Sequence, residues 1–231
     1  VLFIAKNKNG YNNLSKMSSI ANIDGFYYVP RIDKSIVEKY KEGLIVLSGS
    51  KYVEISNKII NVGEKQALDA CLWWKENFMN DFYLEMNIHG DEENEIINEQ
   101  LLKFSKNHDI KVIATNDTKY ISKEDANAHD ILLCVKDGQQ QSTPIGRGRG
   151  FRYGLKNQEY YFKTKDEMIK LFKKYPDAIG NISELVEKVD FYDLSREVLL
   201  PKFSIPENFN SISNDIENEY LKHLVYEGAS E

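Results

Sequence analysis

The segment Gly43-Leu44-Ile45-Val46-Leu47-Ser48-Gly49-Ser50 decides the fold class, because an uninterrupted apolar run ends there in a small polar turn. Such a run is typical of a strand that is covered on both faces. Similar runs follow at Phe82–Met86 and at residues 111–115, and amphipathic helical patterns at residues 64–78 and 92–107 separate the three. This alternation predicts an α/β fold with parallel strands joined by right-handed helical crossovers.

The remaining apolar periodicity predicts short elements on either side of this repeat. Side-chain oxygens of Asp33, Ser122 and Thr164 mark helix starts, and Thr164 forms a capping box with Glu167. We expect strands at residues 1–5 and 160–162, and helices at residues 11–21, 35–40, 123–135, 164–174, 176–189 and from 215 onward. The proline-containing stretch before the last helix predicts an extended connector.

The composition is that of a soluble globular protein. Hydrophobic residues make up 42% and charged residues 29% of the 231 positions, without long blocks of either kind. No apolar run approaches the roughly 18 residues of a membrane-spanning helix, and no signal sequence is evident, so we expect a cytoplasmic protein without membrane contact. Cys71 and Cys134 lie far apart within apolar helical patterns, which predicts buried thiols rather than a disulfide or a metal pair.

The net charge of −6 argues against a broad nucleic-acid-binding surface, because phosphate neutralisation requires clustered basic residues. A local contact remains open in the aperiodic loop at residues 136–157, which we expect to be flexible. Arg147 and Arg149 lie there in a glycine-rich run, and Arg152 follows Phe151. Arginine on phosphate and an aromatic ring on a base would suit nucleic acid, and a solvated loop without a ligand is the alternative.

Two side chains at strand ends are candidates for chemistry. Asp117 follows the third buried strand and His89 follows the second, where barrel enzymes place metal ligands and phosphate contacts. An aspartate that forms a turn, and a loop histidine before Gly90, are the alternatives. The four histidines form no His-x-His or His-x-x-x-His pair, so the sequence does not supply a complete metal shell.

Several segments together resemble one protein family. In chain order they are residues 2–14 (LFIAKNKNGYNNL), 25–33 (GFYYVPRID), 43–49 (GLIVLSG), 81–85, 112–117, 126–134 (ANAHDILLC), 167–172, the helix from Pro176, and 199–203. The series is similar to the polymerase and histidinol phosphatase (PHP) domain of the bacterial DNA polymerase III alpha subunit. It covers nearly the whole chain.

The resemblance implies a distorted PHP-type (β/α) barrel with a multi-metal site at the carboxyl ends of its strands. The family's first ligands, a His-x-His motif and later His and Glu residues, would precede Val1. We therefore expect an N-terminally truncated barrel over residues 1–190. A helical C-terminal extension over residues 191–231 would combine a connector with the start of the polymerase module.

The metal site of the family is incomplete in this sequence. Where the family commonly has Cys this chain has Ser50, and where it has His this chain has Lys119, so only Asp117 matches. An ammonium group cannot donate electrons to a cation, and a serine hydroxyl is a poor ligand. We hypothesise that Lys119 takes the place of a lost cation and pairs with Asp117, which leaves a vestigial site.

The resemblance implies that the full-length protein is a DNA-directed DNA polymerase that acts on DNA and deoxynucleotides. Magnesium would serve its polymerase module, and zinc or manganese would be bound here only if the PHP site were intact. We expect no cofactor in this fragment, which would be a structural platform. Other replicase subunits are expected partners, and the proofreading exonuclease is a candidate among them.

Two other interpretations stay open. The first is a metal-dependent phosphoesterase or 3′–5′ proofreading exonuclease domain, which needs the upstream histidines. The second is a free-standing α/β interaction module, which the cut-looking ends argue against. Exposed strand edges predict self-association of the fragment.

Overall fold

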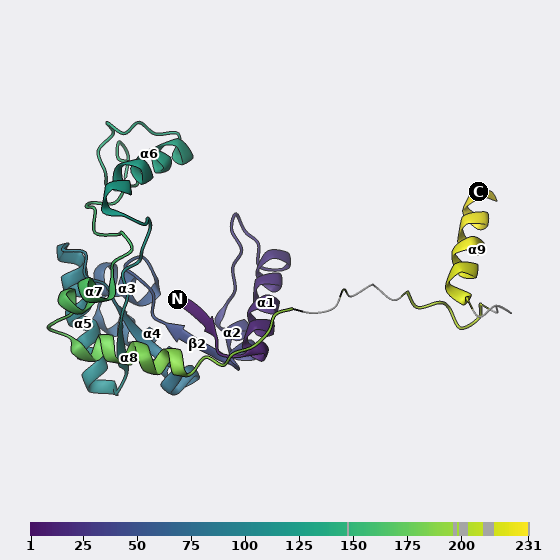
Figure 1. The fold of residues 1–231 in the computed structure, drawn as a ribbon, viewed down its shortest axis with the longest axis horizontal. Coiled ribbons are helices and arrows are strands. Elements are labelled where there is room, and N and C mark those ends of the chain that lie inside the picture. Colours follow the sequence, from purple (N-terminus) through teal and green to yellow (C-terminus); the bar gives the residue numbers. More distant parts are fainter. Residues whose placement is uncertain (147, 196–197, 199–202, 210–214, 231) are drawn as a thin grey trace. The chain divides into compact units, whose positions relative to one another are not determined.

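The computed structural model describes residues 1–146, 148–195, 198, 203–209 and 215–230. The chain divides into two compact units, Val1–Asp193 and Leu194–Glu231. The first unit contains a sheet with helices around it, and the described part of the second contains the helix α9 (Ile216–Ser230) (Figure 1). All of the predicted site residues belong to the first unit.

Four strands form the sheet within the described residues, in the order β1 (Leu2–Ala5), β2 (Leu44–Leu47), β3 (Phe82–Met86) and β4 (Lys111–Ala114). β2, β3 and β4 are parallel, as the alternation predicts. The α/β class is confirmed, with these strands forming an open sheet and not a closed barrel. Parallel strands bring their carboxyl ends to one edge, and the candidate site lies there.

The first strand departs from the parallel expectation, because β1 pairs antiparallel with β2, Ala5 lying opposite Leu44. Two helices, α1 (Lys8–Ile23) and α2 (Lys34–Tyr40), connect these strands. The pair carries the chain away from the end of β1 and back to the same end, so β2 runs in the opposite direction. A single crossover helix would have made the two strands parallel.

One face of the sheet carries the main hydrophobic core. It packs against α3 (Glu54–Asn61), α4 (Glu64–Phe78) and α5 (Glu92–His108). Strand alternation places every second side chain on this face. The buried strand residues of this core are Leu44, Val46, Phe82, Leu84, Met86, Val112 and Ala114.

The opposite face has a smaller core. Ile45, Leu47, Tyr83 and Ile113 are buried there against Leu185. Leu185 belongs to α8 (Pro176–Glu187), which lies along β4 after the short helix α7 (Lys165–Leu171). Apolar side chains on both faces explain why these strands read as continuous hydrophobic runs.

Most helices lie where the sequence places them. The predicted helix at residues 64–78 has the bounds of α4, and the capping roles of Asp33, Ser122 and Thr164 are confirmed by hydrogen bonds to backbone N–H groups. The helix α3 was missed. Its N-cap is Val53, which makes no side-chain capping bond, so the sequence lacks the polar signal that marks the other helix starts.

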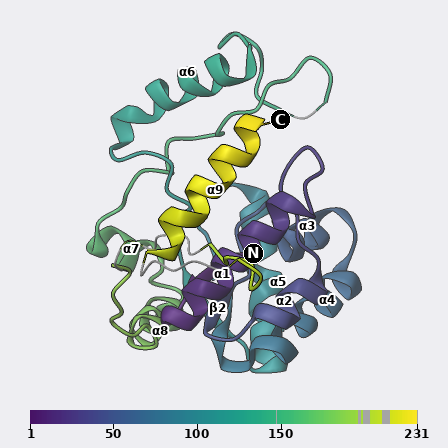
Figure 2. The same ribbon diagram turned by 90° about the vertical axis from the view of Figure 1, so that its right-hand side faces the viewer.

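The helix α6 (Ala126–Asp137) follows the short 3-10 turn η2 (Lys123–Asp125), and with the loop after it forms a projection, residues 122–158, called here the α6 arm. Figures 1 and 2 show α6 held away from the sheet by the two segments that lead to and from it. Tyr120 and Tyr161 form an isolated parallel bridge beside the arm. The strand predicted at residues 160–162 is therefore wrong, because only one residue pair completes the pairing.

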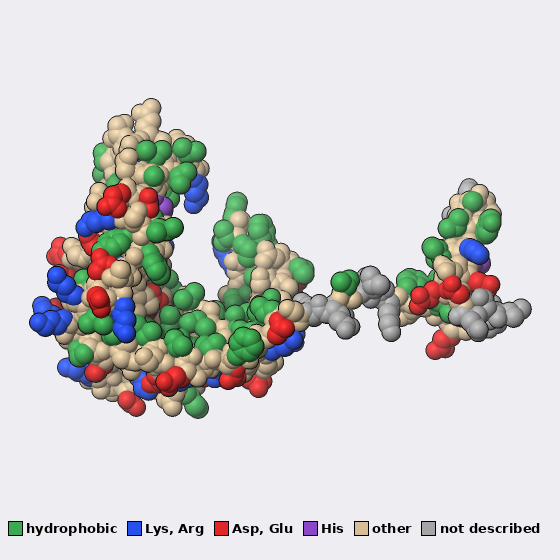
Figure 3. Space-filling view, viewed as in Figure 1, with side chains coloured by type: hydrophobic (Ala, Val, Ile, Leu, Met, Phe, Trp, Pro, Cys, Tyr) green, Lys and Arg blue, Asp and Glu red, His purple; other side chains and the backbone are tan. Residues whose placement is uncertain are grey.

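A second projection is an aromatic hairpin between α1 and α2, with its turn at residues 27–29. Tyr28 is 82% exposed, and Tyr27 bridges to Val29 across the turn. The Arg31 guanidinium lies 5.1 Å from the centroid of the Tyr27 ring. Figure 3 shows hydrophobic side chains at the end of this projection. The hairpin is held by its own ring contacts rather than by burial in the core.

Both cysteines are free and buried, as predicted. Burial raises the pKa of the Cys71 thiol to about 12. Within the described residues, every helix is too short or too polar to cross a membrane.

Candidate functional site

Polar residues end or follow the three parallel strands at their carboxyl edge. The backbone N–H of Glu85 donates to Ser48 Oγ at 2.8 Å, and the Asn87 amide donates to Thr115 Oγ1 at 2.6 Å. The Thr115 hydroxyl donates in turn to Glu85 Oε1 at 2.6 Å. Side chains thus tie β2 to β3 and β3 to β4 at the edge where a PHP-type site is expected.

Glu85 is a buried carboxylate at this edge, with 8% of its surface exposed. Burial raises the pKa of the Glu85 carboxyl, and the negative charge of Asp117 acts in the same direction. The hydrogen bond from Thr115 opposes this shift without cancelling it. Folding therefore favours the protonated form of this carboxyl.

Asp117 and Lys119 form an ion pair beside this network. Asp117 has a left-handed backbone with φ 44°, which non-glycine residues rarely adopt, and it turns the chain after β4. Lys119 Nζ lies 2.7 Å from Asp117 Oδ1. The structure therefore brings these two predicted site residues together, with the ammonium on the carboxylate.

His89 is buried, with 4% of its surface exposed. Its Nε2 lies 2.8 Å from the carbonyl oxygen of Asn116, which can only accept, so Nε2 carries the proton. Its Nδ1 lies 3.1 Å from the Asn94 amide nitrogen and accepts from it. The ring stacks on Tyr160 at a centroid distance of 4.0 Å. Burial lowers the pKa of His89, so the neutral form is favoured and both of its nitrogens are engaged.

A small pocket brings Ser50, His89 and Asp117 to one place, as the sequence predicts for a strand-end site. The other lining residues are Lys51, Tyr52, Asn87, Asn94, Tyr153, Leu155 and Tyr160. Lys119 is not one of the lining residues, but it pairs with Asp117, which is. The pocket therefore contains one carboxylate, one hydrogen-bonded imidazole and a serine hydroxyl.

Lys51 adds a second ammonium to the pocket, and the sequence reasoning missed it. Its Nζ lies 3.4 Å from Asp91 Oδ1 and 2.5 Å from Glu93 Oε2, and its side chain is 10% exposed. Asp91 also caps α5 by accepting from the Asn94 N–H. Only the folded chain brings Lys51 to these carboxylates, whereas Glu85 could have been noticed as a charge inside an apolar strand.

The predicted nucleic-acid contacts in the α6 arm have different environments. Arg149 is exposed, and Arg147 lies outside the described residues. Arg152 is buried, and its guanidinium donates to both carboxylate oxygens of Asp130 and to the carbonyls of Thr143, Gln141 and Tyr153. These five contacts match the five donors of a guanidinium, so none is left for a phosphate oxygen. We therefore assign Arg152 to holding the arm together, which corrects the expected phosphate contact.

The residues of the strand-end pocket do not fit the multi-metal site of the family that the sequence resembles. No group of three or more His, Cys, Asp or Glu side chains in the described part of the chain is arranged to hold a metal ion. The lone pair of His89 Nδ1 accepts a hydrogen bond, and Oδ1 of Asp117 already pairs with the Lys119 ammonium. A cation at Asp117 Oδ1 would have to displace Lys119, so this pair of residues suits a bound ammonium better than zinc or manganese.

One family model matches part of this chain. The PHP domain model matches residues 1–89, which carry β1 to β3 and end at His89. Residues 1–89 of the chain are therefore similar to the PHP domain.

Several known proteins match nearly the whole chain. The chain is 38% identical over 229 residues to the DNA polymerase III subunit alpha of Borreliella burgdorferi, covering 99% of this chain. The corresponding subunits of Campylobacter jejuni and Aquifex aeolicus are both 34% identical, over 96% and 99% of this chain. The chain spans 19% of the length of each of these three relatives. The similarity includes residues beyond the PHP match and covers the α6 arm.

Proposed function

We propose that this chain is the PHP portion of a replicative DNA polymerase catalytic subunit, a DNA-directed DNA polymerase. The names of the relatives and similarity over nearly the whole chain support this proposal. DNA and deoxynucleotides would be the substrates of the full-length protein, and magnesium would serve its polymerase module. Residues 191–231 would be the connector and the start of that module. Other replicase subunits, with the proofreading exonuclease as a candidate, would be its partners.

Within that protein, this portion acts as a structural platform whose phosphoesterase site is closed. The observation that carries this role is the ion pair of Lys119 and Asp117, with 2.7 Å between Nζ and Oδ1. A lysine ammonium has three donors and no lone pair, so it neutralises the carboxylate without ligating a metal. The buried, neutral His89 supports the same role, because metal binding would break its bond from Asn94.

A metal-content measurement on the full-length protein tests the platform role. We expect less than one zinc or manganese per chain at the PHP pocket after dialysis. The variant Lys119→His combined with Ser50→Cys should gain metal there, because an imidazole and a thiolate supply electron pairs. Elemental analysis and calorimetric titration would measure both proteins.

The matched control for this test is Lys123→His, which also replaces a paired lysine. Lys123 Nζ lies 2.7 Å from Glu159 Oε1, away from the pocket, so its substitution should leave metal binding unchanged. Stoichiometric metal in the unmodified protein that Asp117→Ala removes would overturn the platform role. That outcome would instead favour the metal-dependent phosphoesterase.

A further inference from the structure

The α6 arm contains a basic, amide-rich loop within an acidic protein. Residues 138–158 include four basic side chains and no acidic one, whereas the whole chain has a net charge of −6. Five glutamines and asparagines lie in the same stretch. The described basic residues Arg149 and Lys156 are exposed, so their charges are accessible to a ligand. Arg152 is paired with Asp130, so Arg149 and Lys156 are the described basic residues of the loop that can meet a phosphate backbone.

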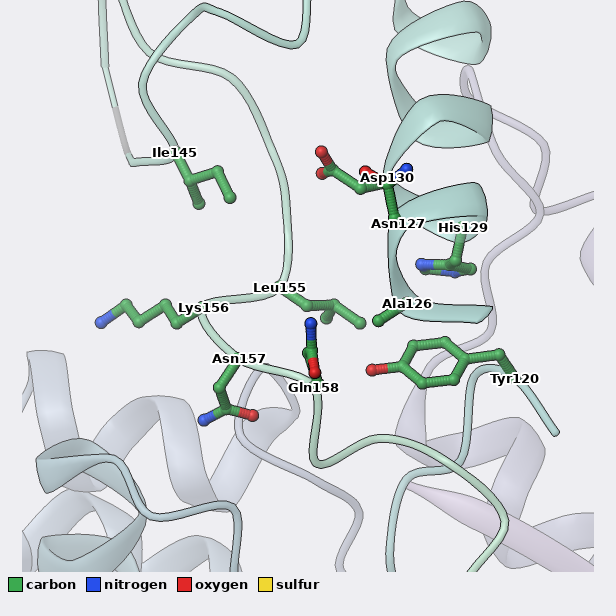
Figure 4. A pocket seen from close by; sticks show the side chains of 10 residues that line it. All are labelled: Tyr120, Ala126, Asn127, His129, Asp130, Ile145, Leu155, Lys156, Asn157 and Gln158. Atoms are coloured by element: carbon green, nitrogen blue, oxygen red, sulfur yellow. The ribbon is translucent and has the colours of Figure 1, made fainter. Parts of the chain in front are cut away.

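A cavity of about 230 Å³ lies between this loop and the first turn of α6. Figure 4 shows the loop residues Leu155 and Gln158 beside the first turn of α6, whereas the Lys156 side chain points away from the helix. Its lining residues are Tyr120, Ala126, Asn127, His129, Asp130, Ile145, Leu155, Lys156, Asn157 and Gln158. The cavity is smaller than the roughly 300–1,000 Å³ of typical ligand pockets. It has room for one ring system rather than for a large ligand.

The Tyr120 hydroxyl lies in this cavity without a hydrogen-bond partner among the described residues. Tyr120 is only 9% exposed, and in Figure 4 its hydroxyl points toward Leu155 and Gln158. Buried hydroxyls are almost always paired, because an unpaired one keeps the full cost of lost hydration. The exposed Gln158 side chain can move aside, so a ligand atom could reach this hydroxyl.

The cavity is lined by hydrogen-bond donors and acceptors, and its one carboxylate is already paired. Asp130 is held by both terminal nitrogens of Arg152 and by the Gln141 amide. The Arg152 hydrogen bond keeps the pKa of Asp130 below its usual range. The rings of Tyr120 and His129 lie at a centroid distance of 5.4 Å and give the cavity an aromatic wall. A planar ligand with donors and acceptors on its edge fits these groups.

We propose that this cavity binds one unpaired nucleobase of single-stranded DNA, while Arg149 and Lys156 contact the adjoining phosphates. A base supplies the planar ring for the Tyr120 and His129 wall and an edge for the Tyr120 hydroxyl. Its phosphates match the loop's positive charge. Paired bases of a duplex cannot enter, so the site selects single strands. This inference goes beyond the platform role and does not depend on whether the strand-end pocket binds metal.

The test uses fluorescence anisotropy of the 231-residue chain with a short, labelled single-stranded oligonucleotide. We compare it with an abasic oligonucleotide of the same length and with the matching duplex. Binding to the abasic strand and to the duplex should be weaker by about 5- to 150-fold, because one stacked base contributes about 1–3 kcal/mol. Equal binding to the abasic strand would show that only charge is recognised, and it would overturn the base site.

The variant Tyr120→Phe separates a binding role from a structural one. It should weaken single-strand binding about three- to tenfold, because it removes one hydrogen bond. Its melting temperature should stay the same or rise, because the hydroxyl has no partner in the described protein. Affinity lost without loss of stability supports the site. Unchanged affinity in Tyr120→Phe overturns it.

The matched control is Tyr161→Phe, at the residue that bridges to Tyr120 through the backbone. The Tyr161 hydroxyl donates to Glu167 at 2.8 Å instead of facing the cavity, so this variant should keep full affinity. A third variant, Lys156→Ala, should weaken binding to every sequence. It should also reduce the slope of log affinity against log salt by about 0.7, the value for one phosphate of a single strand. A salt slope unchanged in Lys156→Ala would overturn the proposed phosphate contact.

Discussion

At the carboxyl edge of the sheet, burial shifts the pKa values of two side chains so that their neutral forms are favoured. Glu85 is buried with a raised carboxyl pKa, while the neutral state of His89 is favoured by its lowered pKa. In contrast, the carboxyl of Glu184 at the surface of α8 has its pKa lowered to about 2, chiefly by the Lys111 ammonium. The pKa of Glu85 is raised and that of Glu184 is lowered, so the two carboxyls make stability depend on pH in opposite directions.

The first prediction concerns Glu85→Gln. A carboxyl whose pKa is raised by folding holds its proton more tightly when folded, so its ionisation costs stability as pH rises above the unfolded value of about 4.3. We expect the variant to raise the free energy of unfolding by about 1 kcal/mol at neutral pH, with little change near pH 4. The Gln oxygen can still accept from Thr115. Urea denaturation followed by circular dichroism at both pH values measures the difference.

Glu184→Gln is the control with the opposite sign. Its carboxyl stabilises the fold above the unfolded pKa, and this contribution is lost as pH falls toward about 2. The variant should therefore be less stable than the parent at neutral pH and equal to it in strong acid. A Glu85→Gln variant that is destabilised at neutral pH would show that the ionised carboxylate is favoured after all.

At the scale of elements, close backbone contact decides how α1 meets the sheet. A Cβ built on Gly10 would lie 2.0 Å from the carbonyl oxygen of Gly43, the residue before β2. That oxygen also accepts a hydrogen bond from Lys6 N–H at 2.8 Å, so it cannot move freely. The absence of a side chain at Gly10 thus allows α1 to lie directly on the chain entering the sheet.

The prediction at this scale is that Gly10→Ala destabilises the fold although alanine favours helices. We expect a loss of about 2–3 kcal/mol, because the backbone must shift to admit the methyl group. The matched control is Gly180→Ala in α8, where an added Cβ meets nothing within 4 Å. This control should gain about 0.5–1 kcal/mol. Equal effects of the two substitutions on the denaturation midpoint would contradict the close contact.

In the first unit, the open sheet has two edge strands whose outer backbone groups can pair with another chain. β1 is the first strand of the sheet, and in the described residues it pairs only with β2. At the other end, the Asn181 amide of α8 donates to the Val112 carbonyl of β4 at 2.8 Å and so occupies part of that edge. On the β1 side, the Tyr192 hydroxyl donates to the Ala5 carbonyl at 3.4 Å, which leaves the part of β1 near Leu2 open to pairing with another copy.

We predict that the 231-residue chain self-associates through β1 as its concentration rises. Leu2 is 52% exposed, and Leu2→Lys should reduce association, because a charged edge strand resists pairing. Leu132→Lys on α6, where Leu132 is 66% exposed, is the control for association through the arm. Multi-angle light scattering over a concentration series measures both variants. A concentration-independent monomer mass for the unmodified chain would refute this prediction.

Local patterns were enough to predict most elements of the fold. The helix at residues 64–78 and the strand at residues 82–86 agree with α4 and β3, because amphipathic period and apolar runs are properties of neighbouring residues. The resemblance to the PHP domain was also found from short segments that follow one another in the same order along the chain. The antiparallel β1 was not predicted, since strand direction depends on how two helices return the chain.

In the candidate site too, some features could be predicted from the sequence and others only from the tertiary structure. The sequence alone marked Ser50, Asp117 and Lys119 by comparison with the family's pattern, and it marked His89 by its place after a strand. Only the tertiary structure showed that His89 has both nitrogens hydrogen-bonded, that all five Arg152 donors are matched, and that the Tyr120 hydroxyl lies in a cavity. The physical reason is that charge state and ligand access depend on burial and on partners far away in the chain. Local residue patterns do not specify those long-range contacts.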